Sequence, residues 1–367
     1  MKIVGFRASA LSIALALLPG CGILQPTVLP SSGSQAPSAA QRSTSAGSYL
    51  YVGGCCPVLS HGGITVYNPG LSGVDRRIFR DANSAYDIAF DTTGRLYVVD
   101  WWGEVVEFDR GSQRRSRRLG LYGAWAVALD SANNLYVDVC PSCVPTLRRS
   151  KGPQPDEVNV YQAGTTKLLR SITRGVHSER ALAFDSAGNL YVANANGKKP
   201  SVTVYAPGSG SILRKMTERL VNPVAIAVDR ADDVFVMNWH PSIIEYAPHS
   251  TKVLRRITNS ISSPQAIALD ASGTLYVANS GTYPDPGWIS VYAPGSAVPE
   301  YKITQGINDP IAVVFDSGGN LYVASNHYGA PGSRGHITVY APGAQTPFAS
   351  VRADKYGNPI SLAVGPQ

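Results

Sequence analysis

The chain has 367 residues, of which 44% are hydrophobic and only 16% are charged, and it contains 36 Gly and 26 Pro. This length and apolar content allow one large core or two ordinary ones, and the many turn-forming residues favour a body built from β-strands. The formal net charge of +7 is a mild surplus, so the composition alone does not indicate a nucleic-acid-binding protein.

The first residues are typical of a bacterial secretion signal. Lys2 and Arg7 accompany an apolar run over residues 8–18, which is too short to span a bilayer. The run leads into Leu-Pro-Gly-Cys, ending at Cys21, which resembles the lipobox of bacterial lipoproteins, although Pro19 departs from the small residues usual there. The resemblance implies removal of residues 1–20, which lowers the net charge from +7 to +5, and lipidation of Cys21. The alternative is an ordinary signal peptide with an incidental cysteine.

Residues 24–48 are rich in Ser, Ala, Pro and Gln and carry almost no charge. Such a composition does not form a core, so residues 21–48 are predicted to be the lipidated cysteine and a disordered linker. We therefore expect an exported protein that is lipid-anchored in the bacterial cell envelope, on the outer membrane or on the outer face of the cytoplasmic membrane.

Residues 49–367 repeat one phrase. A full copy consists of PQAIALD (264–270), SGTLYVAN (272–279) and ISVYAPG (289–295). The aspartate that ends the first piece recurs at intervals of 39 to 55 residues, at Asp91, Asp130, Asp185, Asp229, Asp270 and Asp316. A period near ~40–50 residues is that of one β-propeller blade.

Each piece of the phrase predicts one strand. Small and branched residues alternate in the first piece, as they do in strand a, the crowded strand nearest a propeller axis. Asp270 and Gly273 predict a tight turn, and Leu-Tyr-Val after it predicts strand b. Residues 289–292 are strand c, followed by the type II turn residues Ala-Pro-Gly, and segments such as 252–257 complete the blade as strand d.

Counting the copies gives the architecture. Strand b occurs seven times, at Tyr51, Tyr97, Tyr136, Tyr191, Phe235, Tyr276 and Tyr322. Strand c also occurs seven times, at Tyr67, Phe108, Tyr161, Tyr205, Tyr246, Tyr292 and Tyr340. Six copies of strand a end at the aspartates above, and the seventh is residues 359–364. We predict an all-β, seven-bladed β-propeller with four antiparallel strands per blade, in which the C-terminal strand closes the N-terminal blade.

These repeats resemble those of the NHL-repeat family over residues 48–367, and the Tyr-Val-Ala-Asn pieces are also similar to YVTN repeats. The WD40 pattern fits less well, because no blade has Gly-His and Trp-Asp at its ends. The resemblance implies the fold but no activity, since propellers serve binding, scaffolding and catalysis alike. The sequence has no P-loop, GxSxG, HExxH, EF-hand or dinucleotide-binding motif.

The b–c loops differ in every blade, whereas the a–b and c–d turns are short and uniform. The b–c loops and d–a connections share one end of an antiparallel propeller, so we expect recognition there. The tryptophans fall in or beside b–c loops at Trp101, Trp102, Trp239 and Trp288, and in a d–a connection at Trp125. Their rings suit stacking on sugars or clamping peptides, or alternatively cap the blade ends.

Polar residues end several b strands, at Asp100, Asn194, Asn238 and Asn279. They are expected either to bind a ligand at the channel mouth or to bond local backbone. Basic residues gather in strand d, for example at Arg114–Arg118 and Arg255–Arg256. Charge on outermost strands prevents association between edges, and the alternative is a rim for an acidic partner.

Four cysteines remain besides Cys21, and in an oxidising compartment an even number predicts disulfides. The candidates are Cys55, Cys56, Cys140 and Cys143, paired within or between their loops, with a zinc site as the alternative.

The leading prediction is a binding or scaffold module for a glycan, peptide or protein partner, expected to be a monomer without a cofactor or a nucleic-acid partner. The alternative is a metal-assisted lyase or hydrolase that uses a divalent metal with His61, His240, His327 and Asp100. A third hypothesis is a structural envelope protein held by its outer strands.

Overall fold

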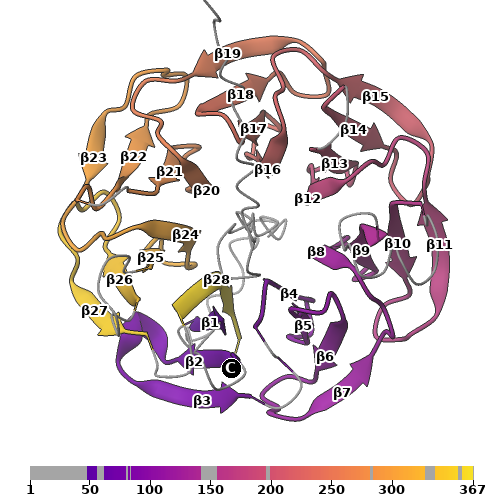
Figure 1. Ribbon diagram of the computed structural model, residues 1–367, viewed down its shortest axis with the longest axis horizontal. Coiled ribbons are helices and arrows are strands. Elements are labelled where there is room, and N and C mark those ends of the chain that lie inside the picture. The colour runs from indigo at the N-terminus through magenta and orange to yellow at the C-terminus, as the bar shows by residue number, and fades with distance from the viewer. Residues whose placement is uncertain are drawn as a thin grey trace, which may run out of the picture.

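The computed structural model shows a ring of seven four-stranded antiparallel sheets, which confirms the predicted seven-bladed β-propeller (Figure 1). The residues it describes are 48–55, 62–79, 82, 84–141, 155–195, 199–281, 284–326, 335–353 and 358–366. The predicted signal peptide, Cys21 and most of the predicted linker therefore lie outside the described residues.

The strands fall into four positions, from the inside of the ring to its rim (Figure 1). The innermost position a holds β28 (Asn358–Gly365), β4 (Asp87–Phe90), β8 (Ala124–Leu129), β12 (Glu179–Phe184), β16 (Pro223–Val228), β20 (Pro264–Leu269) and β24 (Pro310–Phe315). Position b holds β1 (Tyr49–Cys55), β5 (Leu96–Val99), β9 (Leu135–Val139), β13 (Leu190–Asn194), β17 (Val234–Asn238), β21 (Leu275–Asn279) and β25 (Leu321–Ser325).

Position c holds β2 (Ile64–Tyr67), β6 (Val105–Phe108), β10 (Glu157–Tyr161), β14 (Ser201–Tyr205), β18 (Ser242–Tyr246), β22 (Trp288–Tyr292) and β26 (His336–Tyr340). The outermost position d holds β3 (Val74–Ile78), β7 (Arg115–Arg118), β11 (Leu168–Ile172), β15 (Ile212–Met216), β19 (Val253–Ile257), β23 (Tyr301–Ile303) and β27 (Ala349–Arg352). A short 3₁₀ helix (Pro69–Leu71) joins β2 to β3. We number the blades 1 to 7 in the order in which these lists give their strands.

Blade 1 is made from both ends of the repeat region, as predicted. β28 pairs with β1 in antiparallel register, with Leu50 opposite Val364 and Val52 opposite Leu362. The resulting sheet has the order β28-β1-β2-β3, so one strand from the end of the ring completes three from its beginning. This pairing closes the ring and leaves strand β1 without a free edge.

The turns between positions a and b are formed by the repeated aspartate, as the sequence predicts. In blade 6, Asp270 Oδ1 accepts hydrogen bonds from the backbone N–H groups of Ser272 (2.8 Å) and Thr274 (3.0 Å). In blade 5, Asp229 Oδ1 accepts from Ala231 and Asp233 in the same way. The carboxylate thus satisfies N–H groups that the turn leaves unpaired, which explains why the aspartate recurs.

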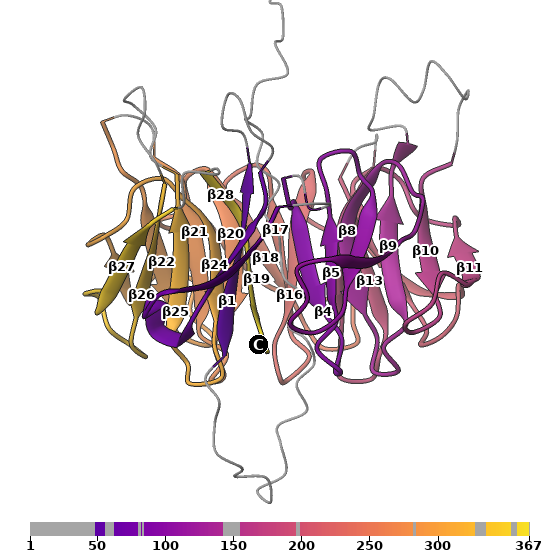
Figure 2. The same cartoon turned by 90° about the horizontal axis from the view of Figure 1, so that it is seen from below.

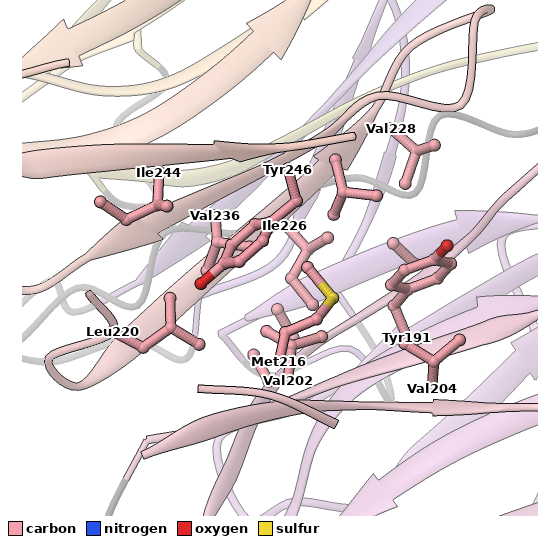
Figure 3. Packing of buried hydrophobic residues seen from close by; sticks show 14 residues of the cluster. Tyr191, Val202, Val204, Met216, Leu220, Ile226, Val228, Val236, Ile244 and Tyr246 are labelled. Atoms are coloured by element: carbon pink, nitrogen blue, oxygen red, sulfur yellow. The ribbon is translucent and has the colours of Figure 1, made fainter. Parts of the chain in front are cut away.

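The core lies between neighbouring blades rather than inside any one of them. Between blades 4 and 5, Tyr191 and Met216 belong to one buried cluster with Ile226 and Val236 (Figure 3). A blade buries its apolar faces only against two neighbours, so its stability depends on the whole ring. Among the described residues, no helix has the length and apolar character needed to cross a membrane.

Candidate functional site

The strand registers place the strand ends that the b–c loops and d–a connections join at one end of the ring. In blade 6, Pro264 begins strand a opposite Asn279, which ends strand b opposite the start of strand c at Trp288. The same order holds in the other blades, and Figure 2 shows the strands running between the two ends of the ring. We call the end with the b–c loops the variable end and the other the uniform end.

At the variable end of blade 2, a compact turn displays two tryptophans. The N–H groups of Trp102 and Glu104 each donate to Asp100 Oδ1 over 2.9 Å, and burial raises the pKa of the Asp100 carboxyl. The turn is also bonded to the start of blade 3, where the N–H of Ala124, the first residue of β8, donates to the Gly103 carbonyl over 3.0 Å. Trp101 and Trp102, which are 40% and 66% exposed, therefore stand on a fixed backbone.

More aromatic side chains surround this turn. The ring of Tyr86 lies 5.4 Å from that of Trp101 and 6.5 Å from that of Trp125, measured between centroids. Tyr122, which is 52% exposed, lies in the connection between β7 and β8, two residues before Ala124. We call these five residues of blades 2 and 3 the aromatic cluster: Tyr86, Trp101, Trp102, Tyr122 and Trp125. Trp101, Trp102 and Tyr122 are exposed, whereas Tyr86 and Trp125 are partly buried. Exposed aromatic rings of this kind form a surface on which sugars and apolar or aromatic side chains stack.

A buried carboxyl group lies directly next to the cluster in sequence. Asp87 Oδ1 accepts from its neighbour Ile88 N–H (2.9 Å), and Oδ2 accepts from Val127 N–H of blade 3 (2.8 Å). Burial, with a smaller contribution from the nearby carboxylate of Asp138, raises the Asp87 pKa from 3.8 to about 7. Asp87 thus joins strand β4 to strand β8.

The sequence analysis missed Asp87 and Asp138, although a signal for both was present. Strand a has an alanine at the position of Asp87 in five other blades, and Asp138 stands where Ala193 and Ala278 stand in their blades. A carboxylate in place of a small buried residue is a departure from the repeat that alignment of the blades reveals.

The predicted tryptophans do not all lie together. Trp239 follows β17 in blade 5 and Trp288 begins β22 in blade 6, on the other side of the ring from blade 2 (Figure 1). The Trp288 indole N–H donates to Ser290 Oγ (2.8 Å), and the Lys302 ammonium lies 4.4 Å from its ring centroid. Trp288 is thereby used in contacts within its own blade, whereas Trp239 is 44% exposed. Trp125 lies inside β8 rather than in the connection before it.

The asparagines that end strand b are buried and share one arrangement. The side-chain oxygens of Asn194, Asn238 and Asn279 accept from backbone N–H groups in the preceding d–a connection, over 2.7 to 2.8 Å. Their amide groups donate to hydroxyls of strand c, those of Thr203, Ser242 and Ser290, over 3.1 Å. These contacts favour the structural alternative, in which the side chain ties two loops together, and ligand binding by these residues stays a prediction.

The histidine and cysteine predictions fall partly outside the described residues, where His61, His327, Cys56 and Cys143 lie. His240 is exposed in blade 5, far around the ring from Asp100. No group of three or more potential metal ligands occurs in the described part of the chain. Cys55 ends β1, and Cys140 is fully buried just after β9.

Comparison with known proteins does not assign the chain to a family. No known protein family matches the chain, and no curated protein is significantly similar to it.

Proposed function

We propose that this chain is an exported, lipid-anchored β-propeller of the NHL-repeat kind that binds a glycan, peptide or protein partner through its variable end. The single observation that carries the binding proposal is the aromatic cluster of blades 2 and 3. Three of its rings, those of Trp101, Trp102 and Tyr122, are 40%, 66% and 52% exposed. Clusters of exposed apolar residues on a protein surface mark interaction sites. Tryptophan and tyrosine are among the residues that contribute most of the binding free energy at such sites.

The turn that carries Trp101 and Trp102 supports the same proposal. Its backbone is held by Asp100 and by the start of blade 3, so little conformational entropy is lost when a partner docks. The other variable-end candidates offer less, because Asn194, Asn238 and Asn279 already bond protein groups. Among the described residues, the candidate metal ligands Asp100 and His240 lie in blades 2 and 5, so they do not form one metal site.

Export and anchoring rest on the sequence. The apolar run over residues 8–18 and the Leu-Pro-Gly-Cys segment that ends at Cys21 support processing and lipidation, which would place the propeller in the cell envelope. In that compartment Cys55, Cys56, Cys140 and Cys143 are proposed to be oxidised. We further propose a monomer that uses neither cofactor nor nucleic acid.

The proposal is tested by screening the full-length protein on glycan and peptide arrays and titrating any ligand found. Trp102→Ala is expected to weaken binding by about tenfold or more, as truncation of a central aromatic contact does. Trp239→Ala is the control, because it removes another exposed tryptophan (44% against 66% for Trp102) that also follows a b strand, but in blade 5. Unchanged affinity in the Trp102 variant would show that the aromatic cluster is not the contact surface.

A further inference from the structure

The outer strands of three consecutive blades carry a leucine at one equivalent position. Leu169 of β11, Leu213 of β15 and Leu254 of β19 each precede the arginine that pairs with the last residue but one of strand c. The equivalent residues of the other blades are Asp75, Ser116, Glu300 and Phe348. The leucines are 41%, 50% and 44% exposed, so three neighbouring blades present leucine to solvent at the same height of the rim.

Further apolar and basic residues extend this surface. Leu168 and Ile212 precede two of the leucines and are 48% and 36% exposed. Four of the exposed side chains near them are basic, those of Lys167, Lys215, Lys252 and Arg256, and others, such as Ser171 and Ser211, are neutral. Strands β11, β15 and β19 read LLRSI, ILRKM and VLRRI and contain no acidic residue. We call this surface of blades 3 to 5 the leucine–lysine rim, and the three strands follow one another around the perimeter in Figure 1.

The arginines that follow the leucines do not belong to this exposed surface. Arg170 and Arg214 donate to the hydroxyls of Tyr136 (2.9 Å) and Tyr191 (3.1 Å) in their own blades. Arg255 is paired with the buried carboxylate of Glu245. Each of these three arginines therefore contacts its own blade, whereas the leucine before it and the residue after it (Ser171, Lys215 or Arg256) are exposed.

We propose that the leucine–lysine rim docks on the surface of an anionic lipid bilayer. Apolar side chains interspersed with lysine and arginine are what interfacial binding to anionic lipid uses, because the leucines enter the headgroup region while the cations contact phosphates. A protein partner fits less well, since the rim has none of the exposed aromatic residues that dominate protein interfaces and is convex rather than hollowed. Blade 4 is the middle blade of the three, so Leu213 enters the lipid more deeply than Leu169 or Leu254. This surface is distinct from the aromatic cluster and does not depend on the proposed function.

The test places a photo-crosslinking amino acid, p-benzoylphenylalanine, at single positions of the full-length chain. Positions 169, 213 and 254 probe the rim, and position 348 is the matched control, because Phe348 is 56% exposed on the outer side of blade 7. Each protein is mixed with phosphatidylcholine vesicles with or without phosphatidylglycerol, irradiated, and analysed for lipid adducts by mass spectrometry. Circular dichroism melting checks that every variant folds.

Lipid adducts are expected at all three rim positions, several-fold above position 348, with the highest yield at 213 and a clear dependence on phosphatidylglycerol. A double variant, Lys215→Glu with Arg256→Glu, is expected to reduce the yield at 213. Equal yields at 213 and 348, or yields that do not respond to phosphatidylglycerol, would overturn the proposal. Crosslinks between two copies of the chain in place of lipid adducts would also overturn it and would mark the rim as a self-association surface.

Discussion

The arginine of strand d has a different partner in different blades. The tyrosine hydroxyl of strand b accepts from an arginine of strand d in blades 1, 3 and 4, where strand c carries valine between them. Blade 5 has Phe235 in place of that tyrosine, and there Glu245 on strand c provides the partner for Arg255. The arginine thus keeps a partner when the hydroxyl is lost, because a buried or half-buried cation without one is costly.

At the same scale, Asp87 is expected to make stability depend on pH. Its pKa is about 7 in the folded protein against 3.8 ordinarily, so between these values the folded state holds a proton that the unfolded state has released. The free energy of unfolding therefore falls as pH rises through this window, by up to roughly 4 kcal/mol. Urea denaturation of Asp87→Asn between pH 4 and 7 is expected to show a flatter profile than the parent.

The control for this measurement is Asp109→Asn, since the Asp109 side chain is 61% exposed. It is expected to change the pH profile far less than Asp87→Asn does. A parent-like slope in the Asp87 variant would mean that another group takes up the proton.

At the scale of strands and turns, much of the structure follows from the repeat. The strand positions, the aspartate turns and the closure by residues 358–365 could all be predicted, because each blade repeats the same local pattern. The aromatic cluster could not, since it depends on hydrogen bonds between the turn of blade 2 and the start of blade 3. Separation of Trp239 and Trp288 from that cluster required the blade order in space, and burial of Asn238 required side-chain contacts that the local sequence does not specify.

The turn that carries Trp101 and Trp102 gives a prediction at this scale. Gly103 has φ 70°, and a Cβ there would lie 2.4 Å from the backbone nitrogen of Gly123. Gly103→Ala is expected to cost roughly 2–4 kcal/mol, because the turn must move away from blade 3. Gly111→Ala is the matched control, with φ 73° and no atom within 4 Å of the added group, and is expected to cost about 1 kcal/mol.

Urea denaturation of both glycine variants measures these costs, and near-ultraviolet circular dichroism reports whether the tryptophans change their surroundings. A Gly103 variant no less stable than the Gly111 variant would show that contact between the turn and blade 3 adds nothing to stability.

For the whole molecule, ring closure is the feature on which stability depends most. Leu362 of β28 belongs to the buried cluster shared with blade 7, and Ala363 belongs to the cluster shared with blade 2. Deleting residues 358–367 removes contacts to both neighbours and leaves an unpaired edge on β1. We expect a loss of more than about 5 kcal/mol, since truncation of one buried leucine alone costs about 2–5 kcal/mol.

Thermal melting followed by circular dichroism measures this loss. Deleting Gln367 alone keeps β28 intact and is expected to leave the melting temperature unchanged. If both deletions melt alike, blade 1 is stable with three strands.

The union of β1 with β28 also affects how the protein is made. The ribosome makes β28 after every other strand of the ring. All strands of blades 2 to 7 and three strands of blade 1 are therefore synthesised before the ring can close. A chain that lacks β28 cannot close the ring, and the apolar faces of blades 2 and 7 that β28 would cover are then exposed to proteases and chaperones. Pairing of β1 with β28 therefore distinguishes complete from truncated chains, because only chains that contain β28 bury the core on both sides of blade 1.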